Sequence, residues 1–230
     1  MTRVGIDAWI RAGLLALPVY GLLTMWSTWD AQPDQVADPE AWAQYVSSTG
    51  YVVDHALGAI GGAVLAILGV FALGCFLSGS RAGRLGLGAM VATVAGHALG
   101  LAIGGVSAFA TPAVGRAYLA GITEVMRIEF PTGMIVVFAL AVLLMFVGNV
   151  LLGWAVWRSG ILPKWAGATW ALSAVLFYVL GAVLGAATTG GSLPTQPLGA
   201  ALMVVSGAWI AWSAGRRSVH ATLGASAPHV

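Results

Sequence analysis

A few ionisable side chains interrupt, or directly precede, long apolar stretches of this chain. Asp54 and His55 stand together in YVVDHALG, and the fifteen residues from Ala63 onwards carry no charge. His97 lies within another apolar stretch, and Glu124 and Glu129 come shortly before a third. Ionisable groups are costly in apolar surroundings and are therefore candidates for function.

The three carboxyl groups of Asp54, Glu124 and Glu129 are the candidate catalytic residues, acting as proton donors. An apolar site disfavours the ionised form of a carboxyl group, which can then protonate a weak base. Aromatic faces near such an acid could hold a developing cation. The candidate substrate-binding residues are His55, His97, Arg127, Trp42, Tyr45, Tyr51, Phe109, Tyr118 and Phe130.

Structural roles explain the same residues without any chemistry. Asp54 would be favoured near a helix N-terminus by the helix dipole. His97 and Asn149 could each make a hydrogen bond between helices. Glu124 and Arg127, three positions apart, could form an exposed ion pair worth a few tenths of a kcal/mol. The two sets of roles stay open at the level of sequence.

Metal and cofactor chemistry find little support in the sequence. His55 and His97 belong to different apolar stretches, and no H-x-x-x-H or E-x-x-H pair occurs. The usual pattern of a di-metal helix bundle is therefore missing. Cys75 is the single cysteine, which excludes an intramolecular disulfide and disfavours a thiolate site. We expect no metal and no cofactor.

The elements that must position these residues are membrane helices. Hydrophobic residues make up 59% of the 230 residues and charged residues only 8%, against about 25% charged in soluble domains. A spanning helix needs roughly 20 apolar residues. Six stretches qualify, which predicts an all-α polytopic bundle: 8–28, 51–77, 85–108, 131–157, 163–186 and 195–214.

Basic residues predict the orientation of this bundle. Eight of the ten lie before the first stretch or at its start, in the second–third and fourth–fifth connections, and after the sixth stretch. The positive-inside rule then places both termini in the cytoplasm, and we expect the plasma membrane. Basic residues that stand singly or in pairs do not form a phosphate-binding stripe, so nucleic acid is not an expected partner.

The expected organisation is one transmembrane domain, residues 1–217, with a polar tail, 218–230. Pro18 should kink the first helix. Asp38-Pro39-Glu40 predicts a helix over 39–49, and 115–130 contains a second helix outside the membrane. Gly88, Ala92, Gly96, Gly100 and Gly104 recur every fourth residue in the third stretch, as do other small pairs in the second and fifth, which predicts close helix approach.

Three segments carry a resemblance to known proteins: VGNVLLGWAVWRSGILPKWAG (147–167), SSTGY (47–51) and GRAYLAG (115–121). They resemble a group of six-helix membrane proteins of high-GC Gram-positive bacteria, most of them uncharacterised. Some members are similar to membrane-bound terpene cyclases that close farnesylated indoles into drimane-type skeletons. The resemblance implies protonation of a polyprenyl alkene or epoxide, ring closure and deprotonation, without a metal. It assigns no role to an individual residue.

Two functions follow as expectations. The first is a membrane-embedded cyclase whose partners are a prenylated substrate, entering sideways from the bilayer, and membrane lipid. The second is a non-enzymatic transporter or accessory membrane subunit. A closed pocket lined by an acid and aromatic rings would favour the enzyme, and a polar path through both faces would favour transport.

Overall fold

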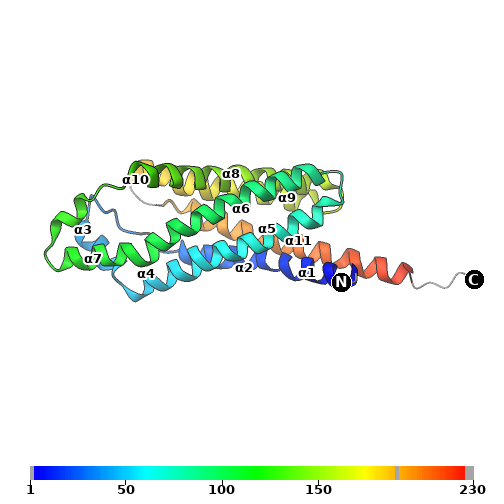
Figure 1. Ribbon diagram of the computed structural model, residues 1–230, viewed down its shortest axis with the longest axis horizontal. Coiled ribbons are helices and arrows are strands. Elements are labelled where there is room, and N and C mark those ends of the chain that lie inside the picture. The colour runs from blue at the N-terminus through cyan, green and yellow to red at the C-terminus, as the bar shows by residue number, and fades with distance from the viewer. Residues whose placement is uncertain (1–2, 190–191, 226–230) are drawn as a thin grey trace, which may run out of the picture.

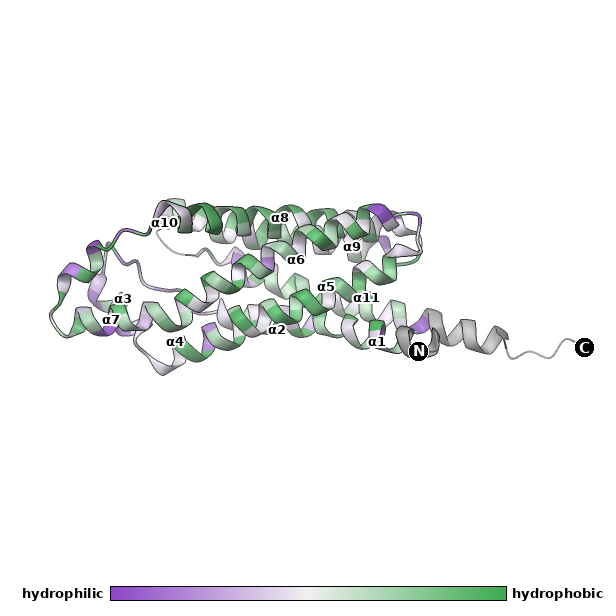
Figure 2. Ribbon diagram, viewed as in Figure 1, coloured by the Kyte–Doolittle hydropathy of each residue, from purple (hydrophilic) through white to green (hydrophobic). Residues whose placement is uncertain are grey.

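The computed structural model describes residues 3–189 and 192–225, and these residues are helical with no strand among them. Six helices are long and apolar enough to cross a membrane (Figure 2), which confirms the predicted class. They are Ala8–Ser27, Thr49–Ser78, Gly83–Leu119, Thr132–Ser159, Lys164–Thr188 and Thr195–Arg216. Most boundaries agree with the predicted stretches to within a few residues, and the third helix is the exception.

Several of the spans consist of more than one helical segment. The segments are α1 (Arg3–Leu14), α2 (Ala16–Ser27), α3 (Pro39–Val46), α4 (Thr49–Asp54), η1 (His55–Gly61), α5 (Gly62–Ser78), α6 (Gly83–Gly105), η2 (Val106–Ala110), α7 (Thr111–Leu119), η3 (Thr123–Arg127), α8 (Thr132–Ser159), α9 (Lys164–Ala174), η4 (Val175–Leu184), α10 (Gly185–Thr189) and α11 (Thr195–Ala225). The segments η1, η2 and η4 are π-helical and η3 is a 3-10 helix. Helix α11 thus continues into the predicted tail.

The helices close into a ring. Helix α2 packs against α5, α5 against α6, α6 against α8, α8 against α9, α9 against α11, and α11 against α2, while α1 lies along α5. Helix α1 starts and α11 finishes at the end of the bundle that carries the α5–α6 and α8–α9 turns (Figure 1). We call this the turn end. The opposite end, covered by α3, α7 and η3, is the cap end.

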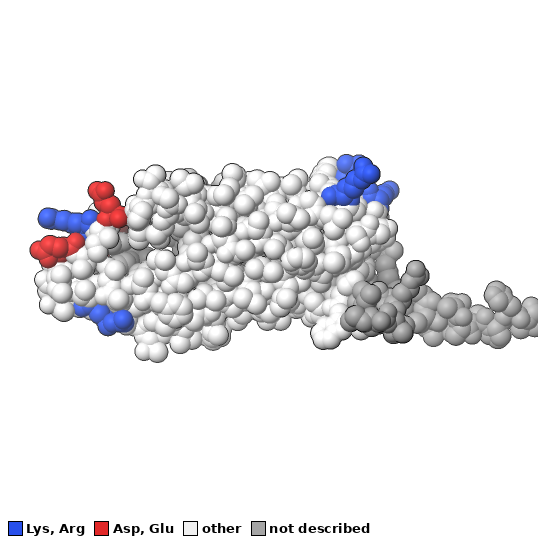
Figure 3. Space-filling model, viewed as in Figure 1, with Lys and Arg blue, Asp and Glu red and all other residues white. Residues whose placement is uncertain are grey.

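Charged side chains gather at these two ends, and the surface between them is uncharged on the face that Figure 3 shows. Arg81, Arg84, Arg158 and Lys164 belong to the turns, and Arg81 Nε donates to the Arg158 carbonyl oxygen at 2.7 Å. The acids on α3, η3 and their loops belong to the cap end. The start of α1 and the end of α11 therefore lie at the same end of the bundle as the basic turns.

Two prolines shape the spans differently from the sequence prediction. The break near Pro18 falls at Leu15, between α1 and α2, because Pro18 has no N–H to donate to the Leu14 carbonyl. Pro112 lies inside the third span, which runs to Leu119 and is therefore longer than the predicted stretch 85–108. The π-helical turn η2 ends at Ala110, two residues before Pro112, and such a turn can satisfy the backbone groups that proline frees.

Small residues allow close helix approach at particular positions. A Cβ atom on Gly96 would lie 2.6 Å from the Met145 backbone nitrogen of α8, and one on Gly153 would lie 2.6 Å from the Gly167 carbonyl oxygen of α9. The predicted stripe is therefore confirmed at Gly96. It is wrong at Gly88, where a Cβ atom would meet nothing within 4 Å. A four-residue spacing drifts around a straight helix, so one neighbour cannot cover the whole stripe.

The cap end has a small core of its own, formed by Trp42, Ala43, Val46 and Tyr51 with Val114 and Tyr118 against it. Asp38 caps α3 as predicted, since its Oδ1 accepts the Ala41 N–H at 3.0 Å. Helix α3 ends at Val46 rather than at residue 49, and α4 begins with a new cap at Ser48. The cap thus packs α3 and α7 over the start of the second span.

Candidate functional site

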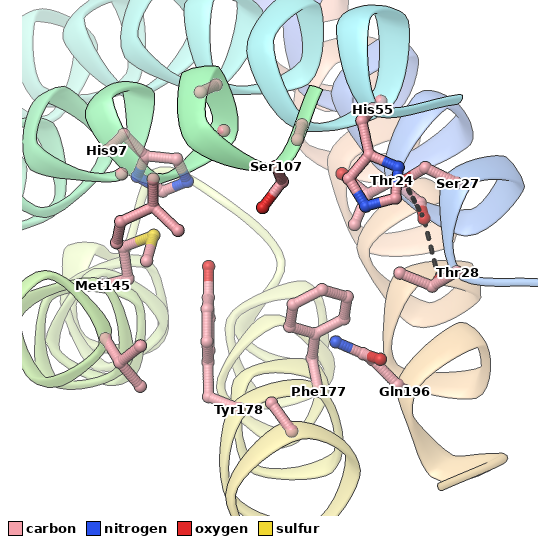
Figure 4. Close-up of a pocket in the computed structure, with 18 of the residues that line it drawn as sticks. Thr24, Ser27, Thr28, His55, His97, Ser107, Met145, Phe177, Tyr178 and Gln196 are labelled. Carbon is pink, nitrogen blue, oxygen red and sulfur yellow. Dashed lines mark hydrogen bonds between the residues drawn. The ribbon is translucent and has the colours of Figure 1, made fainter. Parts of the chain in front are cut away.

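One cavity lies inside the helix ring, in the half nearer the cap end (Figure 4). Its volume is about 310 Å³, within the range of roughly 300–1,000 Å³ that small-molecule sites occupy. The lining comes from α2, η1, α5, α6, η2, α8, η4 and α11: Tyr20, Thr24, Ser27, Thr28, His55, Gly58, Ala59, Ala63, His97, Gly100, Ile103, Gly104, Ser107, Phe138, Val142, Met145, Phe177, Tyr178, Ala182 and Gln196. The turn half of the bundle is filled instead by large apolar side chains such as Leu73, Trp170 and Met203.

All three π-helical segments border this cavity. Segment η1 contributes His55, η2 contributes Ser107, and η4 contributes Phe177 and Tyr178. A π-turn adds a residue to one helical turn and shifts the faces that its neighbours present, and such turns are frequent at functional sites. The three segments together therefore set which side chains point into the ring.

A chain of three polar side chains forms the inner wall. His97 Nδ1 lies 2.8 Å from the Thr93 carbonyl oxygen, and its Nε2 lies 3.4 Å from the Tyr20 hydroxyl. The Tyr20 hydroxyl lies 3.4 Å from that of Tyr178. The rings of Tyr20 and His97 meet edge to face, 5.6 Å apart. All three side chains are buried. Their hydrogen bonds therefore connect α2, α6 and η4 at membrane depth.

A second polar group lines the wall nearer the cap end. His55 Nδ1 lies 2.9 Å from the Tyr51 carbonyl oxygen, and the His55 ring stacks on the Tyr51 ring with centroids 3.9 Å apart. The hydroxyls of Ser27 and Thr28 donate to the Thr24 carbonyl oxygen at 3.2 and 2.8 Å. In Figure 4 this group faces His97 and Tyr178 across the cavity.

An apolar groove lies beside the cavity, between α8 and η4. The groove has a volume of about 340 Å³ and shares Phe138, Val142 and Tyr178 with the cavity. Its remaining lining is Ala139, Leu143, Phe146, Val179 and Val183. Leu143 and Val183 are more than half exposed on the apolar surface of the bundle. The groove therefore borders the cavity on one side and the apolar surface of the bundle on the other.

Apart from Asp54, the predicted site residues divide into three sets. His55 and His97 line the cavity. Trp42, Tyr45, Tyr51 and Tyr118 pack in or against the small core of the cap. Glu124, Arg127, Glu129, Phe109 and Phe130 are exposed. Of the predicted set, the structure thus places only the two histidines in the cavity, and it gathers the four aromatic residues in the separate core of the cap.

Asp54 is half-buried at the end of α4 and is not part of the cavity lining. Its charge acts on the cap instead: burial raises the pKa of the Tyr45 phenol, and the negative charges of Asp30 and Asp54 raise that pKa further. Among the described residues no carboxylate lines the cavity. The cavity itself offers imidazole, phenol, hydroxyl and amide groups within aromatic and aliphatic walls.

Sequence reasoning missed most of the lining, above all Tyr20 and Tyr178. A signal for both was available, because each places a phenol near the middle of an apolar stretch. Buried tyrosine hydroxyls usually find a hydrogen-bond partner. Uncharged polar side chains within the spans therefore indicate the cavity lining as well as charged ones do, and they include Tyr20 and Tyr178 beside His97.

Metal ligands do not gather in the part of the chain that the structure describes: no group of three or more His, Cys, Asp or Glu side chains could hold an ion there. No protein-family model, curated protein or solved structure matches this chain. The features that indicate function are therefore the cavity and its lining.

Proposed function

We propose that this protein binds a lipid-soluble small molecule, with a prenyl-type chain and one polar group, inside the helix ring. The observation that carries the proposal is a cavity with a polar inner wall that shares Phe138, Val142 and Tyr178 with an apolar groove beside it. His97, Tyr20 and Tyr178 would hold the polar group. Phe138 and Val142, which border both spaces, would contact the chain.

The groove gives such a molecule a route from the bilayer. From Thr132 to Leu140 nearly every side chain of α8 is exposed, so this half of the helix is loosely covered by its neighbours. A chain dissolved in the membrane could pass between α8 and η4 without crossing water. The packed turn half gives no support to a polar path through both faces, which favours binding over transport.

Binding can be measured by native mass spectrometry of the purified protein in detergent with farnesol as the probe. Ala182 lines the cavity, and Ala182→Phe should fill part of it and weaken farnesol binding at least about tenfold, or 1.4 kcal/mol. Val205→Phe is the matched control, because Val205 is exposed on α11 away from the cavity. Equal farnesol binding by both variants, with unchanged melting temperatures, would reject the cavity as the site.

Cyclisation of the bound chain is a second proposal, and the walls of the cavity favour it. Tyr20, Phe138 and Tyr178 present aromatic faces that could hold a carbocation. The neutral imidazoles of His55 and His97 could accept the proton lost at ring closure. The cavity lining does not supply the acid that would start the reaction. Among the predicted proton donors, Asp54 is the nearest in sequence to a lining residue, because it adjoins His55.

The proposed setting is the plasma membrane with both termini in the cytoplasm. Support comes from the basic turns, which lie at the same end of the bundle as the start of α1 and the end of α11. The cavity would then open in the outer half of the membrane, beneath the cap.

A further inference from the structure

The hydrogen bonds of the inner wall have defined directions. The Thr93 carbonyl oxygen can only accept, so His97 Nδ1 must carry the hydrogen and a neutral ring leaves Nε2 as an acceptor. Tyr20 must then be the donor in the bond between its hydroxyl and Nε2, because Nε2 of this tautomer has no hydrogen to donate. The Tyr20 oxygen in turn accepts the hydrogen of Tyr178. The Tyr178 oxygen keeps its lone pairs for whatever enters the cavity.

The same reasoning applies to the wall nearer the cap end. His55 Nδ1 donates to the Tyr51 carbonyl oxygen, so its Nε2 is an acceptor as well. The hydroxyls of Ser27 and Thr28 donate their hydrogens to the Thr24 carbonyl oxygen, so towards the cavity they can only accept. Side chains from three elements therefore present acceptors to the cavity. Ser107 is different: its hydroxyl faces that of Tyr178 across the cavity (Figure 4) and can still donate.

A charged ligand would lack a counter-ion. Among the described residues no Asp, Glu, Lys or Arg lines the cavity. A lone charge at membrane depth is costly, so a neutral group that donates and accepts fits this site better than an ammonium or phosphate group.

We infer that the polar group of the ligand is a neutral hydroxyl, which places the ligand among long-chain alcohols. The hydroxyl donates to the Tyr178 oxygen and accepts from Ser107, while the chain leaves along the groove through Phe138 and Val142. This inference rests on the proposed binding function and adds the chemical class of the ligand.

Three probes with one chain test the inference on the purified full-length protein: farnesol, farnesyl methyl ether and farnesylamine. The ether can accept but cannot donate, and the amine is charged at neutral pH. Farnesol should bind roughly five- to tenfold more tightly than the ether, the fold-change expected for one hydrogen bond. The amine should bind more weakly than farnesol. Equal or tighter binding of the ether or the amine would overturn the inference.

The variant Tyr178→Phe tests whether the preference for farnesol depends on the Tyr178 hydroxyl. Tyr178→Phe removes the acceptor oxygen and retains the ring, so it should abolish the preference for farnesol over the ether. Tyr45→Phe is the matched control, because Tyr45 lies in the cap and does not line the cavity; it should retain the preference. A preference that survives Tyr178→Phe would overturn the assignment of the acceptor. Failure of all three probes to bind would reject the proposed function itself.

Discussion

Gly96 is where the packing of the ring can be tested most sharply. Its missing side chain lets α8 approach α6 so closely that an added Cβ atom would lie 2.6 Å from the Met145 nitrogen and 3.0 Å from the Leu144 carbonyl carbon. Ordinary van der Waals contact begins at 3.4 Å, and both neighbours are backbone atoms that cannot rotate away. Gly96→Ala therefore requires the two helices to separate.

The expected cost is about 1–3 kcal/mol, the usual penalty for overpacking a tight contact. In a protein of this size each kcal/mol lowers the melting temperature by roughly 2–4 °C. Gly100 and Gly88 provide graded controls on the same helix. A Cβ atom on Gly100 would lie 3.6 Å from the Met145 sulfur, and one on Gly88 would touch nothing. Both alanine substitutions should leave the melting temperature unchanged or raise it, because alanine favours the helix.

Thermal unfolding in detergent, followed by tryptophan fluorescence, measures all three variants under one condition. Of the three variants, Gly96→Ala alone should be destabilised. Farnesol binding gives a second readout, because Met145 also lines the cavity and would move with α8. A Gly96→Ala protein as stable as Gly88→Ala would refute the close contact between α6 and α8.

Three further predictions concern orientation, a buried hydrogen bond and the proposed reaction. In a Cys75→Ser background, Val36→Cys in the exposed loop before α3 should react with an impermeant maleimide in intact cells, and a cysteine in the C-terminal tail should not; the reverse pattern would invert the bundle. Asn149→Leu should cost about 1 kcal/mol of stability, because Asn149 Oδ1 accepts the Trp170 indole N–H at 3.0 Å; unchanged unfolding would show that this bond contributes nothing. If Asp54 initiates cyclisation, Asp54→Asn should lower turnover of a farnesylated aromatic by about 10²–10⁴-fold at an unchanged melting temperature, and parental turnover would leave Asp54 as a structural residue.

Local patterns predicted the scaffold well because they depend on short stretches of chain. The length of the apolar stretches is enough to give six spans. The Asp38 cap follows from the residues beside it, and a lone Asn149 among apolar residues has to find a partner on a neighbouring helix. The spans and the Asn149 bond are decided by the cost of leaving polar groups unpaired in an apolar setting, whereas the Asp38 cap satisfies a free N–H group in the first turn of α3.

The candidate site could not be predicted in the same way, because long-range packing creates it. Tyr20 and Tyr178 are 158 positions apart and meet only when the ring closes. The π-helical turns rotate the cavity-facing side chains and leave no periodic signal in the sequence. The predicted acid Glu124 is exposed, because the third span continues past Pro112 to Leu119 and Glu124 follows in η3 at the cap end.

Photo-crosslinking tests the central claim, that the cavity in the helix ring is a binding site, most directly. A farnesol analogue with a diazirine on its chain would be irradiated with the purified protein, and the adducts mapped by peptide mass spectrometry. We predict adducts on η4 and α8 around Tyr178 and Val142, lost when excess farnesol competes. The comparison surface is the groove between α1 and α5, lined by Trp9, Leu68 and Phe71, which any membrane-dissolved probe can reach. Adducts confined to that groove, or adducts at Tyr178 that excess farnesol leaves unchanged, would contradict the account.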